Sequence, residues 1–173
     1  MNKDDIDLLD KTLSKTNDWL KFAEAKNGAI VAVVCTVMFG VNRVVVSMEE
    51  LPGYLSVYIL AFFVLSLLSL VISLCSFIPR LKKPFWLKAE EKNSRDNPFY
   101  FGDVCKYDGY SYLKLLGMTD KSQDKVVEKL ADQIVINSRI ASLKYGLFTS
   151  AVWLFISSLI TPFGAAFLWM LRE

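Results

Sequence analysis

Residues 51–79 have the sequence LPGYLSVYILAFFVLSLLSLVISLCSFIP, which contains no charged side chain over 29 residues. A second stretch, residues 145–171, is uncharged over 27 residues. A helix needs roughly 20 apolar residues to cross the hydrocarbon core of a bilayer, which is about 30 Å thick. Both stretches are long enough, and the sequence therefore predicts an all-α membrane protein.

A third span is predicted nearer the N-terminus. Only 16 uncharged residues separate Lys26 from Arg43, which is about 24 Å of helix, so we extend this span to Val46. Arg43 then lies near an interface, where it either reaches the lipid headgroups or lines a polar path between helices. The predicted spans are 28–46, 54–78 and 145–171, and the first two form a hairpin, 28–78, that turns at Pro52-Gly53.

Residues 1–27 are charged, with five Lys against six Asp and Glu. Their apolar side chains recur at steps of three and four residues, which predicts an amphipathic helix. The stripe consists of Ile6, Leu9, Leu13, Leu20 and Ala23. It either covers the protein's own soluble part or pairs with a partner helix.

Basic residues flank the predicted spans mainly on one side. They are Lys21, Lys26, Arg80, Lys82, Lys83, Lys88, Arg139 and Lys144. Cytoplasmic loops carry an excess of Lys and Arg. We therefore expect an inner-membrane protein with a cytoplasmic N-terminus, a cytoplasmic segment 79–144 and a periplasmic C-terminus. The cluster at 80–83 fits an anchor for anionic membrane lipid.

Segment 79–144 is expected to be a small, mainly helical sensor or oligomerisation segment. It contains the phrase NPFYFGDV at 97–104 and a short predicted helix, YSYLKLL, at 110–116. A helical pattern then runs from about Ser122, with Thr119 or Ser122 as its cap. It meets no Pro or Gly before Gly146, so the helix is expected to enter the third span unbroken. Pro162 predicts a static kink or a hinge within that span.

Composition excludes several classes of site. The chain has no His, which removes His-based acid–base catalysis and HExxH zinc sites. Its three Cys are 30 and 40 residues apart, too far for a CxxC pair. No phosphate-binding glycine motif is present, and a net charge of +2 does not favour nucleic acid as a partner. We therefore predict no catalytic residue, metal ligand or resident cofactor.

Eight residues of segment 79–144 could bind a small molecule. Aromatic rings can stack a nucleobase, amides can bond its edges, and Arg or Lys can pair with a phosphate. The candidates are Phe99, Tyr100, Phe101, Asp103, Gln133, Asn137, Arg139 and Lys144. Among them we expect Tyr100 to stack the base and Arg139 and Lys144 to contact the phosphate. Alternatively, Phe99 and Phe101 form a small core and Asn137 fixes helix register.

The phrases NPFYFGDV (97–104) and LADQIVINSRIASLKY (130–145) resemble the transmembrane effectors of the Pycsar antiphage system. The layout is also similar, with an N-terminal helix, two spans, a cytoplasmic segment and a last span. The resemblance implies a bacterial effector coupled to a nucleotide cyclase that makes cCMP or cUMP. It further implies that the effector senses this cyclic mononucleotide, forms a homo-oligomer and disrupts the inner membrane, which causes abortive infection.

Two other functions compete with this one. A non-enzymatic scaffold or accessory subunit would bind a partner helix through residues 1–27 and ignore ligand. A lipid-modifying enzyme would need a carboxylate or thiol near the membrane, and Asp103 with Cys105 is the candidate pair.

Overall fold

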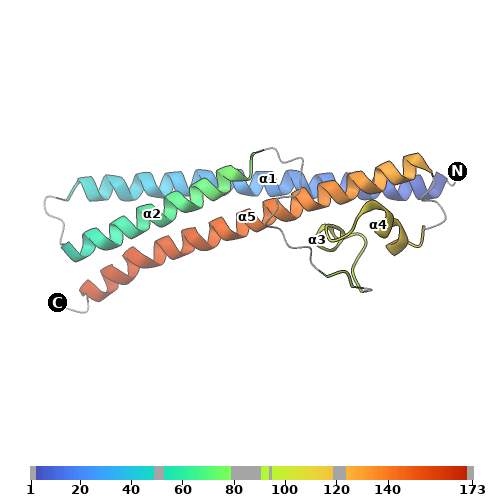
Figure 1. Ribbon diagram of the computed structural model, residues 1–173. Helices are drawn as coiled ribbons and strands as arrows, with labels where there is room; N and C mark the ends of the chain where they lie inside the picture. Colours follow the sequence, from blue (N-terminus) through green and yellow to red (C-terminus); the bar gives the residue numbers. More distant parts are fainter. Residues whose placement is uncertain (1–2, 49–52, 79–90, 94, 119–123, 171–173) are drawn as a thin grey trace. The chain divides into compact units, whose positions relative to one another are not determined.

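The chain folds as helices. The computed structural model describes residues 3–48, 53–78, 91–93, 95–118 and 124–170. Over these ranges the elements are α1 (Lys3–Val46), α2 (Gly53–Cys75), α3 (Phe101–Val104), α4 (Gly109–Leu115) and α5 (Lys125–Met170), and no strand occurs among them (Figure 1). Three helices, α1, α2 and α5, are long and apolar enough to cross a membrane. The prediction of an all-α membrane protein is confirmed.

The helices divide between two compact units. One comprises residues 1–24 and 79–145, and we call it the loop-bearing unit. The other, the apolar unit, comprises residues 25–78 and 146–173. The predicted segments 1–27 and 79–144 therefore fall almost entirely into one unit. The first predicted span is not a separate helix, because α1 runs without a break from Lys3 to Val46.

The loop-bearing unit has a continuous hydrophobic core. Figure 1 shows α3 and α4 beside the N-terminal part of α5, and the core lies where they meet α1. Its buried members are Leu9, Val104, Tyr107, Tyr112, Leu113, Met118, Val127, Ala131, Ile134 and Val135. The apolar stripe expected at 1–27 thus packs within the protein's own unit, with Leu9 fully buried.

Local sequence sets both ends of α4. Asp108 is the N-cap, and its carboxylate accepts a hydrogen bond from the backbone N–H of Ser111 at 2.9 Å. At the other end Gly117 has φ +73°, which suits glycine. The N–H of Met118 bonds the carbonyl of Leu113, and that of Gly117 bonds Lys114, which is the Schellman arrangement. α4 therefore ends where the glycine allows the chain to turn.

The start of α5 differs from the prediction. Its N-cap is Asp124, whose carboxylate accepts from the N–H of Val126 at 2.9 Å. The predicted caps Thr119 and Ser122 lie outside the described residues. From Lys125 the helix continues through Pro162 to Met170, which bears out the unbroken entry into the third span. The kink and the hinge at Pro162 stay predictions.

The apolar unit is held by small polar side chains. Ser66 Oγ of α2 donates to Ser158 Oγ of α5 at 3.0 Å, and Ser69 Oγ donates to the Ala151 carbonyl at 2.7 Å. Serine lets helix backbones approach closely in lipid and bonds across the interface. After Cys75 the backbone N–H groups of residues 76–78 bond the carbonyls three residues earlier, as in a tighter helical turn. The α-helix α2 therefore ends before the predicted span 54–78 does. The Pro52-Gly53 turn and the basic cluster 80–83 fall on residues outside the described ranges, apart from Gly53.

Candidate functional site

The phrase NPFYFGDV forms a tight turn that leads into α3. The Asn97 side-chain oxygen accepts from the N–H of Phe99 at 2.9 Å, an Asx turn. The N–H of Asn97 in turn donates to the Asp103 carboxylate at 3.0 Å. One turn of helix, Phe101–Val104, follows and buries Phe101 and Val104. The adjacent aromatic residues therefore point in different directions: Phe101 is buried, whereas Tyr100 is 46% exposed.

Beside this turn lies a polar group that we call the Lys106 cluster, made of Asp96, Asp103, Lys106 and Tyr107. The Lys106 ammonium bonds Asp103 at 2.9 Å and Asp96 at 3.2 Å. The Tyr107 hydroxyl donates to Asp96 at 2.9 Å. The bond to Asp103 holds the pKa of Lys106 above its usual value, and a backbone hydrogen bond from Asn93 holds the pKa of Asp96 below its own. These contacts keep Lys106 and Asp96 charged at neutral pH, and the cluster fixes the loop between residues 96 and 107.

Four aromatic rings gather around this loop. Trp19 comes from α1, Tyr100 and Phe101 from the loop and α3, and Tyr145 from α5. The rings of Phe101 and Tyr145 are stacked, with centroids 5.1 Å apart and 21° between planes. The centroid of the Trp19 ring lies 5.6 Å from that of Phe101, in a tilted geometry. It lies 6.3 Å from that of Tyr145, in an edge-on geometry. Three segments that are distant in sequence thus form one aromatic cluster.

A cavity of about 520 Å³ opens on this cluster, and we call it the aromatic pocket. Its described lining consists of Trp19, Tyr100, Phe101, Gly102, Asp103, Ser142 and Tyr145. Ligand sites are typically cavities of about 300–1,000 Å³ with mostly apolar walls and a few polar groups. The aromatic pocket has this size and this chemistry.

Gly102 permits a close approach in the wall of the pocket. A Cβ atom added there would lie 2.5 Å from Cε1 of the Tyr100 ring, closer than real Cβ contacts allow. The ring rests on the glycine and also lies 4.9 Å from the Phe101 ring. The absence of a side chain at position 102 therefore allows the Tyr100 ring to lie where it does at the pocket.

The structure brings some of the predicted site residues together and separates others. Tyr100, Phe101 and Asp103 line the aromatic pocket. Phe99 is not among the described lining residues and is 43% exposed. Gln133 and Asn137 form a polar chain on α5 instead: Gln133 donates to Asn137 at 2.9 Å, and Asn137 donates to Asn17 of α1 at 2.7 Å.

The two predicted phosphate contacts have protein partners. Arg139 Nε donates to the Cys105 carbonyl at 3.1 Å, and its Nη2 donates to the Tyr107 carbonyl. It therefore ties α5 to the backbone between α3 and α4. Lys144 pairs with Glu24 of α1 at 2.8 Å, and its side chain is only 11% exposed. A role for either in phosphate binding stays a prediction.

Sequence reasoning missed four lining residues, Trp19, Gly102, Ser142 and Tyr145. Ser142 and Tyr145 are three residues apart on α5 and thus share a helix face, which a helical wheel could have indicated. Trp19 lies off the apolar stripe of residues 1–27, and an aromatic residue outside the stripe was the available clue. Within the described ranges, no group of three or more His, Cys, Asp or Glu is placed to hold a metal ion.

Comparison with known proteins identifies the family. The model of the Pycsar effector protein domain, PycTM, matches residues 8–171, nearly the whole chain. The chain belongs to the Pycsar effector family. It is also 31% identical, over 137 residues, to the Pycsar effector protein PtPycTM of Propioniciclava tarda. That alignment covers 77% of this chain and 64% of the relative, so the chain spans somewhat less than two thirds of its relative's length.

No solved structure matches this chain. The family match confirms the resemblance carried by the phrases at 97–104 and 130–145. Both phrases contribute to the aromatic pocket: the first supplies Tyr100 to Asp103, and the second supplies Ser142 and Tyr145. The most distinctive parts of the sequence therefore meet in the same cavity.

Proposed function

We propose that this Pycsar effector is a bacterial antiphage protein that responds to a cyclic pyrimidine nucleotide, cCMP or cUMP, by associating with further copies of itself and disrupting the inner membrane. A partner nucleotide cyclase supplies the ligand during infection, and the result is abortive infection. Family membership supports the effector role. The basic flanks of the spans support a cytoplasmic loop-bearing unit and a periplasmic C-terminus.

One observation carries the coupling between sensing and the membrane. The aromatic pocket takes Trp19 from α1 and Ser142 and Tyr145 from α5. Each of these helices continues without a break into a segment that is long and apolar enough to span a membrane. A ligand that changes the packing around Trp19 and Tyr145 therefore acts directly on two spanning helices.

The spanning part of α1 supports self-association. In its most apolar window only 6% of the residues are buried within the chain. Its large side chains, such as Val33 at 48% and Phe39 at 66% exposed, are open to lipid or to another copy. Three spans cannot enclose a pore alone, so a membrane lesion requires several copies. Closed rings are the expected arrangement.

The competing functions receive less support. The scaffold hypothesis needs the apolar stripe of residues 1–27 for a partner, but Leu9 and Ala23 of this stripe are fully buried within the chain. The enzyme hypothesis needs a reactive Asp103 and Cys105. Asp103 is held by Lys106, and the Cys105 thiol donates to the Gly102 carbonyl at 3.0 Å. We therefore propose a non-enzymatic effector.

Leakage from vesicles tests the proposal. The purified full chain is reconstituted into liposomes that hold a self-quenching dye, with several copies per vesicle, and cCMP, cUMP, cAMP and cGMP are added separately. We expect dye release with a pyrimidine nucleotide and none with the purines, together with a larger cross-linked species. Protein-free liposomes are the control. If none of the four nucleotides changes the leakage seen without nucleotide, the proposal is contradicted.

A further inference from the structure

We propose that the aromatic pocket binds the pyrimidine base of the activating nucleotide and that Asp103 selects cytosine over uracil by accepting a hydrogen bond from the exocyclic amine. This inference rests on the proposed function, and it adds the site and the basis of its specificity. It assigns two tasks to different groups: the rings provide affinity, and the carboxylate provides the choice of base.

The rings can bind any pyrimidine. Trp19, Phe101 and Tyr145 present aromatic surface from three segments around a cavity of about 520 Å³. Stacking of a base on an aromatic side chain adds affinity and tolerates every base, because each base has a π face. Stacking alone therefore cannot separate cytosine from uracil, which have the same ring size.

Asp103 can make that distinction. Among the described lining residues it is the one with a carboxylate side chain. An ionised carboxylate only accepts hydrogen bonds. Cytosine presents an N4 amine, a donor, at the position where uracil presents the O4 carbonyl, an acceptor, and carboxylates characteristically accept from cytosine N4. If uracil bound in the same orientation, its O4 carbonyl would face the Asp103 carboxylate, and two acceptors cannot form a hydrogen bond.

The Lys106 cluster holds Asp103 ready for this contact. One carboxylate oxygen accepts from Lys106 at 2.9 Å and the other from the N–H of Asn97 at 3.0 Å. A carboxylate has about four acceptor positions, so each oxygen can accept a further bond. The side chain is 25% exposed, which leaves it accessible from the cavity. Its orientation is therefore fixed before the base arrives, which lowers the entropic cost of the contact.

The charge of the lining also indicates which part of the nucleotide enters. The described lining residues include no Lys or Arg. The predicted phosphate contacts, Arg139 and Lys144, already bond carbonyls of the loop and Glu24, respectively. A described lining with one carboxylate and no Lys or Arg does not favour a phosphate. The base, and not the cyclic phosphate, is thus the part that this pocket recognises.

Equilibrium binding to the full chain in detergent tests the inference. Radiolabelled cCMP and cUMP are titrated against the wild type, and dye release from proteoliposomes is measured in parallel. One well-placed base contact of this kind is worth about 5- to 150-fold in discrimination, so we expect cCMP to bind at least fivefold tighter. Asp103→Asn offers both a donor and an acceptor and should bring the two affinities to within about twofold.

Asp96→Asn is the matched control. Asp96 bonds the same Lys106 ammonium but is not among the described residues of the pocket lining. If the preference came from loop stability, both substitutions would remove it, and that result would overturn the inference. We expect Asp96→Asn to retain the preference for cCMP.

A ligand analogue keeps the test decisive if Asp103→Asn does not fold. The cyclic phosphate of pyrimidin-2-one riboside lacks the exocyclic amine and adds no bulk. Wild-type protein should bind it at least fivefold more weakly than cCMP, and equal binding would overturn the inference. If cUMP caused dye release at the same concentration as cCMP or at a lower one, the inference about Asp103 would be overturned, but the proposed function would stand. No release with either nucleotide would overturn both.

Discussion

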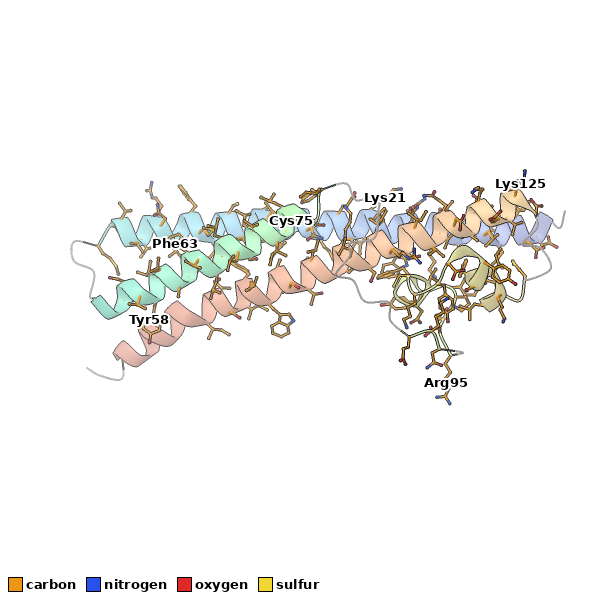
Figure 2. All side chains as sticks on the ribbon, viewed as in Figure 1. Lys21, Tyr58, Phe63, Cys75, Arg95 and Lys125 are labelled. Atoms are coloured by element: carbon orange, nitrogen blue, oxygen red, sulfur yellow. The ribbon has the colours of Figure 1, made fainter. Side chains whose placement is uncertain are left out.

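The two units of this member of the Pycsar effector family differ in the side chains that they bury. In the loop-bearing unit the continuous core contains large apolar side chains, such as Leu113 and Ile134. In the apolar unit Ser66, Ser69 and Ser73 are fully buried beside a few apolar residues such as Phe62. Large residues there point outward, among them Leu60 at 65% and Trp153 at 64% exposed (Figure 2 shows many of the side chains). One unit is thus organised for water and the other for lipid.

This contrast shows which force holds each unit together. Around the loop, burial of apolar surface supplies the main stabilisation, and charged contacts such as Arg139 and the Lys106 cluster fix the backbone at its edge. The spanning helices gain little from burying leucine against each other, because lipid tails are equally apolar. Close packing of small residues and hydrogen bonds of serine therefore stabilise the contacts between these helices. Substitutions of the same type should therefore have very different effects in the two units.

The largest effect is expected from truncation of the buried core. Ile134→Ala removes a fully buried side chain and should cost about 2–5 kcal/mol. Leu67→Ala truncates a residue of α2 that is 53% exposed and should cost less than about 1 kcal/mol. Hydrogen exchange of peptides that contain each site, in detergent, measures both local stabilities. Equal losses at the two positions would contradict the contrast between the units.

The next effect should appear at alkaline pH. Tyr112 is fully buried, and burial raises its pKa from 10.0 to about 12. Because the folded pKa is above the unfolded one, the stabilisation is complete below pH 10 and is lost as pH rises towards 12, by about 3 kcal/mol in all. Amide protection of α4, corrected for the intrinsic exchange rate, should fall over this window. Tyr112→Phe, which keeps the ring, should reduce the pH dependence even though it loses the bond to the Pro98 carbonyl.

Arg139→Ala should have an intermediate effect. It leaves the carbonyls of Cys105 and Tyr107 without their charged donor, and such bonds are worth about 1.5–3 kcal/mol. Faster proteolysis within residues 97–118 would show the loss. Lys129→Ala serves as the control, because Lys129 is 77% exposed in a long ion pair with Asp132 and should have almost no effect. Unchanged proteolysis of Arg139→Ala would show that this residue does not stabilise the loop.

The smallest effect is expected from the serine pair of the apolar unit. Ser66→Ala removes the bond to Ser158, and comparable bonds between membrane helices average about 0.6 kcal/mol. A double-mutant cycle with Ser158→Ala isolates the coupling between the two hydroxyls. A coupling above about 2 kcal/mol would mean that hydrogen bonding, and not close packing, dominates this interface.

Much of the fold follows from the sequence, because it depends on patterns that are local along the chain. The long uncharged stretches at 51–79 and 145–171 are enough to predict α2 and the membrane part of α5, and the motif YSYLKLL predicts α4. The continuity of α1 is less evident. The shift from charged to apolar residues near Gly28 indicates a boundary, but the helix passes through it. A change of environment need not be a change of secondary structure.

The site could be predicted only in part, for a physical reason. Tyr100, Phe101 and Asp103 are adjacent in a distinctive phrase, so the chain itself indicates them. Trp19 and Tyr145 join them through packing of α1 against α5, and no local pattern encodes that contact. Arg139 and Lys144 were expected at a phosphate because of their charge. The structure gives them internal partners, Glu24 and two backbone carbonyls, that sequence alone could not show.

The order of synthesis gives the polar chain from Asn17 to Asn137 a further meaning. Asn17 and Asn137 are 120 residues apart. At about 5–20 residues per second, a ribosome takes roughly 6–24 s to make the intervening chain. During that interval α1 has been made, but the α5 residues that complete its core have not. A nascent chain that has not yet reached Tyr145 therefore lacks part of the aromatic pocket, which requires residues from Trp19 to Tyr145.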